Sequence, residues 1–356
     1  MNPERGKLGI CVIGSGRAGM IHARNFARGL PGARLVALAD PHAPTLQEAQ
    51  RELEVETGYA SYRDALSDPR VHAVVVVTPT SLHRQIVLDA ASAGKHVLCE
   101  KPMAMDVREC DEMIAACDAA KVKLQIGFMR RYDDSFTAAR ERVAAGEIGE
   151  VVLVKSLSHG PSVPQEWMFD LRKSNGPLAE VSSHDIDAAR WFVGAEIDEV
   201  YAIGGNFRCP QAAQKYPDFY DNVAMVCRFE NGKQGFIDGA MSVGYGYDSR
   251  MEILGTSGVM FVGRREQDFV VTCSTARGIV QPFVKSWRTL FIDAYEAEDR
   301  DFVDCILRDR PPRVCGIDGR MAVAVVNAGN RSIAERTPVR VEKKAVEKKA
   351  VERKPR

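Results

Sequence analysis

The stretch CVIGSGRAG, residues 11–19, decides the fold of the first part of the chain. It places Gly14, Gly16 and Gly19 directly after an apolar run and before the helical segment MIHARNFARGL. In a strand–turn–helix unit the first glycine permits the tight turn, the second lets a phosphate approach the backbone, and the third lets the helix pack closely on the strand. The spacing therefore predicts a dinucleotide-binding loop, with the pyrophosphate at the N-terminus of the following helix.

An acidic residue stands where such a loop needs one. Asp40 lies 21 residues after Gly19, at the end of the next apolar run. We expect its carboxylate to accept hydrogen bonds from the adenosine ribose and to repel a 2′-phosphate, which predicts NAD as the cofactor. The alternative is a strand-end turn residue before Pro41. Further cofactor contacts are expected from the loop and from two later strand ends, at Ser15, Arg17, Ala18, Thr78, Pro79, His83, Glu100 and Lys101, although His83 could equally be a helix-start residue without a chemical role.

The pattern of apolar runs changes near residue 150. Before it, short β-branched runs alternate with helical stretches, as in RLVALAD, VHAVVVVTP, KHVLCEKP and KLQIGF. Such alternation indicates βαβ units and a parallel sheet of the Rossmann type. After it, strand follows strand from VVLVKSLS to FVVTCST, with two helices at about 291–308 and 317–336 and a last strand at 339–341. We predict an α/β fold: a Rossmann dinucleotide-binding domain at 1–127, an α+β substrate-binding and oligomerisation domain with a large, mostly antiparallel open sheet at 128–341, and a charged tail at 342–356.

Composition excludes several classes of protein. The 356 residues include 48 basic and 48 acidic side chains and are 45% hydrophobic, with no apolar run long enough to span a membrane. This favours a soluble cytoplasmic protein without nucleic-acid or membrane partners. The nine cysteines form no CxxC pair, so we expect reduced core thiols and no metal site. The broad sheet needs cover, which predicts a homodimer or homotetramer.

The segment LAEVSSHDIDAARWF, residues 178–192, concentrates acids around one imidazole. On one continuous helix Glu180, His184 and Asp187 would share a face. The alternative is a helix start, with Ser182 as N-cap and Asp185 completing a capping box. A metal site made of Glu180, His184 and Asp187 is disfavoured because no second histidine or cysteine lies nearby in the sequence.

A lysine in GKHVLCEKPMAM is held at a strand end, because Pro102 fixes its own φ and biases Lys101 away from helix. With this motif the chain resembles the Gfo/Idh/MocA oxidoreductases, on GSGRAG, TPTSLH, AGKHVLCEKP and the acid-x-x-x-His-x-x-Asp segment. Within that family, GFMRRYD (127–133) and GYGYDSRMEILGTSG (244–258) are most similar to inositol 2-dehydrogenases.

The resemblance implies NAD-dependent oxidation of a ring secondary hydroxyl on a cyclic polyol or sugar. Lys101 matches the family's EKP lysine, His184 its catalytic histidine, and Glu180 the acid four residues earlier. A histidine is suited to take the hydroxyl proton, a neighbouring carboxylate to orient it, and an ammonium to stabilise alkoxide character. Substrate contacts are expected from Lys101, Arg131, His159, Asp187, Tyr245 and Tyr247, each of which could instead be structural.

One departure from the family puts the substrate in doubt. Many inositol dehydrogenases carry aspartate where this chain has Glu180, and a longer acid changes which ring hydroxyls fit. A dehydrogenase or reductase for another sugar therefore stays open. So does a non-catalytic sugar- or dinucleotide-sensing protein of the same fold, although a sensor would not need Lys101, Glu180 and His184 together.

Overall fold

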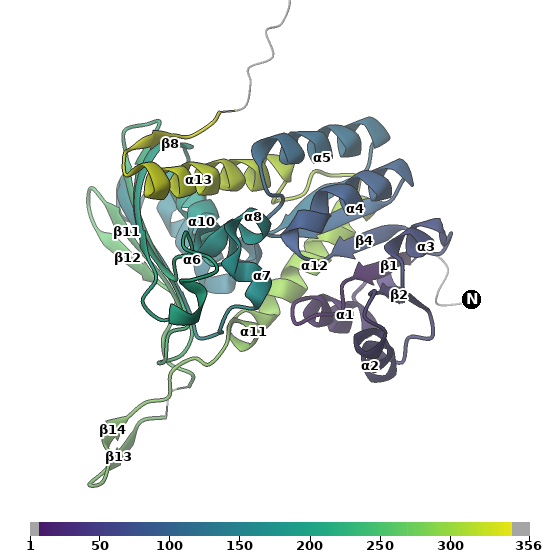
Figure 1. Cartoon of the computed structure of the whole chain (residues 1–356), viewed down its shortest axis with the longest axis horizontal. Helices are drawn as coiled ribbons and strands as arrows, with labels where there is room; N and C mark the ends of the chain where they lie inside the picture. Colours follow the sequence, from purple (N-terminus) through teal and green to yellow (C-terminus); the bar gives the residue numbers. More distant parts are fainter. Residues whose placement is uncertain (1–6, 269, 344–356) are drawn as a thin grey trace, which may run out of the picture.

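The computed structural model describes residues 7–268 and 270–343, and two sheets organise it (Figure 1). The first has six strands, all parallel, in the order β3-β2-β1-β4-β5-β6. This is the strand order of a doubly wound dinucleotide-binding fold, so the predicted Rossmann domain is confirmed. Its strands are β1 (Leu8–Ile13), β2 (Ala33–Ala39), β3 (Gly58–Tyr59), β4 (Ala73–Val76), β5 (His96–Glu100) and β6 (Leu124–Gly127).

Helices pack on this sheet, which explains why its central strands are continuous apolar runs. Every residue of β4 is buried, as are five of the six in β1. The connecting helices are α1 (Gly19–Ala27), α2 (Ala43–Leu53), α3 (Tyr62–Ser67), α4 (Thr80–Ser92) and α5 (Val107–Ala120). The strand order reverses between β1 and β4, and ligands of such folds bind outside the carboxyl ends of the strands at this point.

The second sheet has seven strands in the order β12-β11-β7-β10-β9-β8-β15. Only the β7–β10 pair is parallel, which confirms the predicted, mostly antiparallel sheet. The strands are β7 (Val151–Gly160), β8 (Ile197–Gly205), β9 (Asn222–Phe229), β10 (Gln234–Met241), β11 (Asp248–Gly255), β12 (Val259–Val262) and β15 (Val339–Arg340).

The two faces of this second sheet differ. Its inner face packs against α10 (Ser183–Val193) and α13 (Gly316–Glu335), which contact β7 and β8. Its outer face carries exposed apolar side chains on four strands, namely Ile203, Val226, Leu254 and Phe261. Side chains alternate between faces along a strand. Whether a position in the strand is odd or even therefore decides on which face of the sheet its side chain lies.

The expected strand FVVTCST does not join the large sheet, and this prediction was wrong. Residue 269 lies outside the described residues; β13 (Thr272–Ser274) pairs with β14 (Gly278–Val280) in a hairpin that projects from the body (Figure 1). The cause lies at Gly263, whose φ of 92° turns the chain after β12 and whose added Cβ would lie 2.3 Å from the Ser249 carbonyl oxygen. Cys273 is exposed on this hairpin, so the prediction that this thiol lies in the core was also wrong.

The last helices return to the first domain. Phe302 and Val303 of α12 (Ile292–Leu307) pack into the same buried cluster as Ile10 and Leu38 of the parallel sheet. Each predicted range, 1–127 and 128–341, therefore contains one of the two large sheets, but side chains pack across the boundary between the ranges. The division into two domains stays a prediction. The remaining helices are η1 (Met129–Tyr132), α6 (Asp134–Ala144), α7 (Glu166–Phe169), α8 (Leu171–Ser174), α9 (Gly176–Glu180), η2 (Pro210–Ala212) and α11 (Trp287–Leu290).

Within the described part of the chain, no helix combines the length and apolar character that crossing a membrane requires. Most of the charged tail, residues 344–356, lies outside the described residues.

Candidate active site

The three glycines of the loop do three different things. Gly14 has a φ of 99°, and a Cβ there would lie 2.3 Å from the Val77 carbonyl oxygen. A Cβ on Gly19 would lie 1.9 Å from the Gly14 carbonyl oxygen, so the helix can pack this closely only without a side chain. A Cβ on Gly16 would meet nothing within 4 Å. Gly14 and Gly19 thus serve the fold, whereas Gly16 keeps a space open that no protein atom fills.

The helix behind this space is prepared for an anion. No side chain caps the N-terminus of α1. Among the described residues, the amides of residues 16–19 have no backbone acceptor. The Met20 amide is the first in this turn to have one, the Gly16 carbonyl oxygen. Free amides and the helix dipole favour negative charge. The open space at Gly16 and this uncapped turn fit the pyrophosphate of a dinucleotide.

Asp40 follows β2 and reaches the same loop. Its Oδ2 accepts the Ser15 amide at 2.8 Å, and its Oδ1 accepts the His42 amide at 2.8 Å. The carboxylate is therefore fixed beside the glycine loop, as a ribose-binding acid must be.

His83 joins two strand-end loops instead of facing open space. It is 1% exposed, with Nδ1 2.9 Å from the Pro102 carbonyl oxygen and Nε2 2.8 Å from the Thr78 carbonyl oxygen. The predicted contact between this imidazole and the cofactor stays a prediction. The geometry shows how the segment after β4 and the Lys101–Pro102 segment are held together.

Lys101 links the first domain to the segment before His184. It follows β5, and its Nζ donates to the Glu180 carbonyl oxygen at 2.9 Å. In a continuous helix that carbonyl would accept the His184 amide. Instead α9 ends at Glu180 and α10 begins at Ser183. The expected single helix was therefore wrong.

The capping alternative was right in position but wrong in its contacts. Ser182 is the N-cap residue of α10, but it has helical backbone angles and its side chain makes no cap hydrogen bond. Asp185, expected to complete a capping box, is fully buried and binds the Arg130 guanidinium at 2.7 Å and the Ser156 hydroxyl at 2.6 Å. Asp185 thus serves tertiary contacts and not a capping box.

His184 lies in a buried environment that favours its neutral form. It is 6% exposed, its ring stands edge-on to Phe128, and its Nδ1 has no hydrogen-bond partner among the described residues. Burial, and then the charges of Lys101 and Arg130, lower the pKa of His184 well below its usual value. An uncharged imidazole beside an ammonium can accept a proton at neutral pH.

Glu180 does not hydrogen-bond to His184 in this structure. Its Oε1 is buried and has no partner in the described part of the chain, and burial raises the pKa of its carboxyl while Lys101 opposes this. The expected orientation of the imidazole by this carboxylate stays a prediction. The free oxygen is available to another polar group.

Two of the predicted substrate contacts bind each other. The Arg131 guanidinium donates to Asp187 through Nε at 2.8 Å and Nη2 at 2.6 Å, and to Asp318 at 2.9 Å. These contacts are those of the structural alternative for Arg131, with partners on α10 and α13. Asp187 is therefore committed to arginine and does not join Glu180 and His184 in a metal-ligand set.

The remaining three candidates fall on two sides of the second sheet. Ser156 and Ser158 of β7 face inward, since they bind Asp185 and Arg130. His159 therefore faces outward, where its Nδ1 contacts the Tyr245 hydroxyl and its Nε2 lies 3.1 Å from Asp238 Oδ1. Tyr247 is 7% exposed and lies within electrostatic reach of Arg130 and Asp185, on the side of His184.

Sequence reasoning missed Arg130, which underlies this region. It is 1% exposed and joins Asp185 to Ser158, which accepts from Nη2 at 2.5 Å. The available signal was its position: two consecutive arginines directly follow a buried strand end in GFMRRYD.

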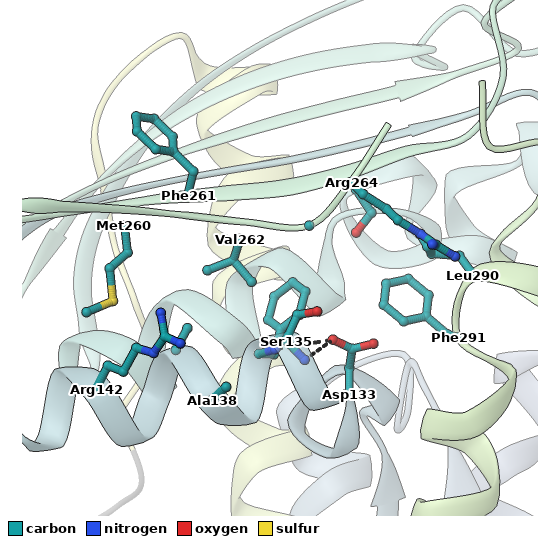
Figure 2. Close-up of a pocket in the computed structure, with 14 residues that line it drawn as sticks. Asp133, Ser135, Ala138, Arg142, Met260, Phe261, Val262, Arg264, Leu290 and Phe291 are labelled. Carbon is teal, nitrogen blue, oxygen red and sulfur yellow. Dashed lines mark hydrogen bonds between the residues drawn. The ribbon is translucent and has the colours of Figure 1, made fainter. Parts of the chain in front are cut away.

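A cavity of about 500 Å³ lies away from these groups, between α6, β12 and the α11–α12 junction (Figure 2). Figure 2 shows Arg142 on α6 and Arg264 after β12 on its sides, with Val262 and Phe291 facing it. Neither Lys101, Glu180 nor His184 lines it. The candidate active-site residues thus lie outside this cavity, and their side-chain chemistry identifies them.

A nucleotide loop beside a fixed ammonium and a neutral imidazole defines the class of protein, a dinucleotide-dependent oxidoreductase. The chain belongs to the Gfo/Idh/MocA family. Residues 8–128 match the oxidoreductase family's NAD-binding Rossmann fold, and residues 136–261 match the GFO/IDH/MocA C-terminal domain. It is accordingly an NAD-dependent enzyme, as the sequence predicted.

Several inositol dehydrogenases are similar over nearly the whole chain. The scyllo-inositol 2-dehydrogenase (NAD(+)) of Bacillus subtilis is 32% identical, covering 94% of this chain and 96% of the relative. The myo-inositol 2-dehydrogenase of Thermotoga maritima is 33% identical, with 94% and 98% covered. A structure of Lactobacillus casei scyllo-inositol dehydrogenase with bound NAD(H) and scyllo-inositol has a TM-score of 0.85 at 29% identity, covering 94% of this chain and 99% of that one.

Proposed function

We propose that this enzyme oxidises a secondary hydroxyl on the ring of a cyclic polyol or sugar, and that its substrate is of the inositol type. The observation that carries the proposal is the Lys101 ammonium fixed on the Glu180 carbonyl oxygen, next to the buried His184. The relatives named inositol dehydrogenases support the substrate class.

In this proposal Lys101 binds the reacting hydroxyl. Among the described residues its Nζ makes one hydrogen bond, at 2.9 Å to a backbone carbonyl oxygen, which leaves further ammonium protons for a substrate oxygen, because a lysine has three donors. A positive charge at that oxygen stabilises alkoxide character as the proton leaves.

His184 takes the hydroxyl proton on a ring nitrogen. Its lowered pKa keeps the ring neutral before reaction, and Phe128 fixes one edge of the ring. Bound NAD supplies the hydride acceptor at its nicotinamide ring. The positive charge that forms on His184 can be stabilised by Glu180 once substrate orders that side chain.

Glu180 is also the candidate that selects among ring hydroxyls. Its Oε1 is buried without a partner among the described residues, and such an acceptor is costly unless a ligand satisfies it. A second hydroxyl of the ring would donate to it. Tyr247 lies on the same side of the sheet and is the remaining tyrosine candidate for a substrate contact.

A substrate panel tests this function. Inositol stereoisomers, aldoses and sugar acids are offered with NAD, and formation of reduced cofactor is followed by absorbance. We expect an inositol to give the highest kcat/KM. A preference for an aldose or sugar acid would assign another substrate. NAD binding without turnover of any compound would favour the sensor alternative.

A Glu180→Asp variant sharpens the test, because it restores the acid expected from the resemblance. If Glu180 selects the hydroxyls, the ranking of inositol isomers should change while the affinity for NAD does not. An unchanged ranking would remove Glu180 from substrate recognition.

A further inference from the structure

A buried group of two carboxylates and one imidazole lies beneath the catalytic edge, and the proposed function uses none of its side chains. His22 of α1 stands between Asp299 of α12 and Glu100 of β5, with Nδ1 2.7 Å from Asp299 Oδ1 and Nε2 3.2 Å from Glu100 Oε1. Asn25 donates to the other Asp299 oxygen at 2.8 Å. His22 and Asp299 are 0% exposed.

The geometry favours a protonated His22. A neutral imidazole has one N–H, but both ring nitrogens here face a carboxylate oxygen, so with Asp299 and Glu100 ionised both bonds form only if the ring is protonated. Burial alone would lower the pKa of His22, but Asp299 and Glu100 hold it well above its usual range. No lysine or arginine side chain within the described residues contacts these carboxylates. The imidazolium is therefore the charge that keeps them in place.

The chain of contacts ends at the catalytic lysine. The second oxygen of Glu100, Oε2, accepts the Lys101 amide at 2.9 Å. Lys101 is thus held at both ends: its backbone by Glu100, and its Nζ by the Glu180 carbonyl oxygen. Any rotation of the Glu100 carboxylate would release the backbone of Lys101.

We propose that His22 and Asp299 are positioning residues for Lys101, acting through the carboxylate of Glu100. The inference rests on the proposed function, because it takes Lys101 as the residue that binds the reacting hydroxyl. It also joins two parts of the site, since His22 lies in the first turn of α1, directly after the glycine loop. The cofactor helix and the catalytic lysine are thereby fixed to the same group.

Glu298 provides a matched control beside this network. It precedes Asp299, is 0% exposed, and neither of its carboxylate oxygens has a hydrogen-bond partner in the described part of the chain. Burial, and then the charge of Glu100, raise the pKa of Glu298 well above its usual value. Replacement by the neutral, equally large glutamine should therefore leave Lys101 in place.

The central experiment compares Asp299→Asn with Glu298→Gln. Asparagine keeps the shape but removes the charge, so His22 no longer holds both ring protons, and the Glu100 carboxylate loses the positive charge that faces it. We expect kcat to fall about ten- to a hundredfold, the scale for misplacing a catalytic group, with the dissociation constant of NAD within about threefold of wild type. Glu298→Gln should keep kcat within about twofold.

A second background tests whether the effect passes through Lys101. In Lys101→Ala protein, Asp299→Asn should lower the residual kcat little further, since residues that act as a unit are not additive. An equal loss in both backgrounds would overturn the proposal. So would an unchanged kcat in folded Asp299→Asn enzyme. If Lys101→Ala itself keeps normal turnover, the proposed function fails, and the positioning inference falls with it for a different, recognisable reason.

A milder variant and a metal measurement complete the test. If Asp299→Asn does not fold, Asn25→Ser loosens Asp299 without removing its charge, and kcat should still fall, about threefold or more; normal turnover would count against the proposal.

His22, Glu100 and Glu298 could also hold a metal ion, with candidate ligand atoms within 4.8 Å of one another. A stoichiometric metal in the purified enzyme, whose removal lowers kcat, would replace the imidazolium as the positioning element.

Discussion

The glycine loop and the region around His184 belong to one proposed active site, but they are built in opposite ways. The loop acts through backbone: open space at Gly16, a positive φ at Gly14 and amides at the start of α1. The second region acts through side chains from separate segments, among them Lys101, His184 and Arg130. Backbone geometry is encoded locally, whereas a side-chain site depends on packing between distant segments.

The largest expected effect belongs to the side-chain region. His184→Ala should lower kcat by roughly two to four orders of magnitude, the range for losing a general base. The dissociation constant of NAD, measured by calorimetry, should stay near wild type because the nucleotide contacts lie in the first domain.

A matched histidine controls for nonspecific damage. His72 is exposed at the opposite, amino-terminal edge of the parallel sheet, where its Nδ1 accepts the Gly9 amide at 2.8 Å. His72→Ala should cost some stability and leave kcat unchanged. Near-normal turnover in folded His184→Ala enzyme would contradict the assignment of the base.

The backbone region should respond in binding and stability instead. Gly16→Val should weaken NAD binding about tenfold or more with little change in melting temperature, because its side chain enters space that only the cofactor would fill. Gly14→Ala should destabilise the fold by about 1–3 kcal/mol, since its φ of 99° is strained for any other residue. Calorimetry measures the change in NAD binding, and thermal unfolding measures the change in stability. A Gly16→Val protein that does not fold would contradict the assignment of Gly16 to binding and Gly14 to the fold.

The third effect is smaller and concerns the choice of cofactor. With Asp40 fixed beside the loop, kcat/KM with NAD should exceed that with NADP by about tenfold or more, equivalent to about 1.4 kcal/mol. Asp40→Ser should narrow this ratio, because it removes the charge that repels a 2′-phosphate. Equal efficiency with both cofactors in the wild-type enzyme would remove Asp40 from ribose recognition.

These differences explain how much the sequence could predict. The alternation of strands and helices, the three glycines and the strand-end positions of Asp40 and Lys101 follow from local spacing. The end of α9 does not, because Lys101, 79 residues away, takes the Glu180 carbonyl oxygen. Nor do the partners of Arg131, which lie 56 and 187 residues along the chain. The outward direction of His159 depends on the register and parity of β7 in the sheet.

The pH dependence of the reaction tests the environment of His184. A base whose pKa lies below its usual value of 6.5 becomes protonated only at lower pH. The acid limb of kcat/KM should therefore fall below pH 6.5, with a flat rate above it. Lys101→Met removes a charge that lowers this pKa, so the limb of its residual activity should move to higher pH. An acid limb above pH 6.5 in the wild-type enzyme would contradict the assignment of this limb to a His184 with a lowered pKa.

The smallest expected effect on catalysis concerns the outer face of the seven-stranded sheet. Ile203, Val226 and Phe261 are 60%, 50% and 76% exposed there, and large exposed apolar side chains on several strands of one face are typical of an interaction surface. We expect a homodimer or homotetramer with closed symmetry built on this face. Val226→Glu should lower the mass measured by light scattering at micromolar protein, because it places a charge on the face that the expected assembly would bury. Its kcat should stay within about twofold of wild type, since Lys101 and His184 act on the inner side of the same sheet. A Lys155→Gln control changes an outer-face side chain that is already polar and paired with Glu252, and it should disturb assembly less. A wild-type monomer would show that this face is free in solution, and a large loss of kcat in the dissociated variant would show that the two faces are coupled.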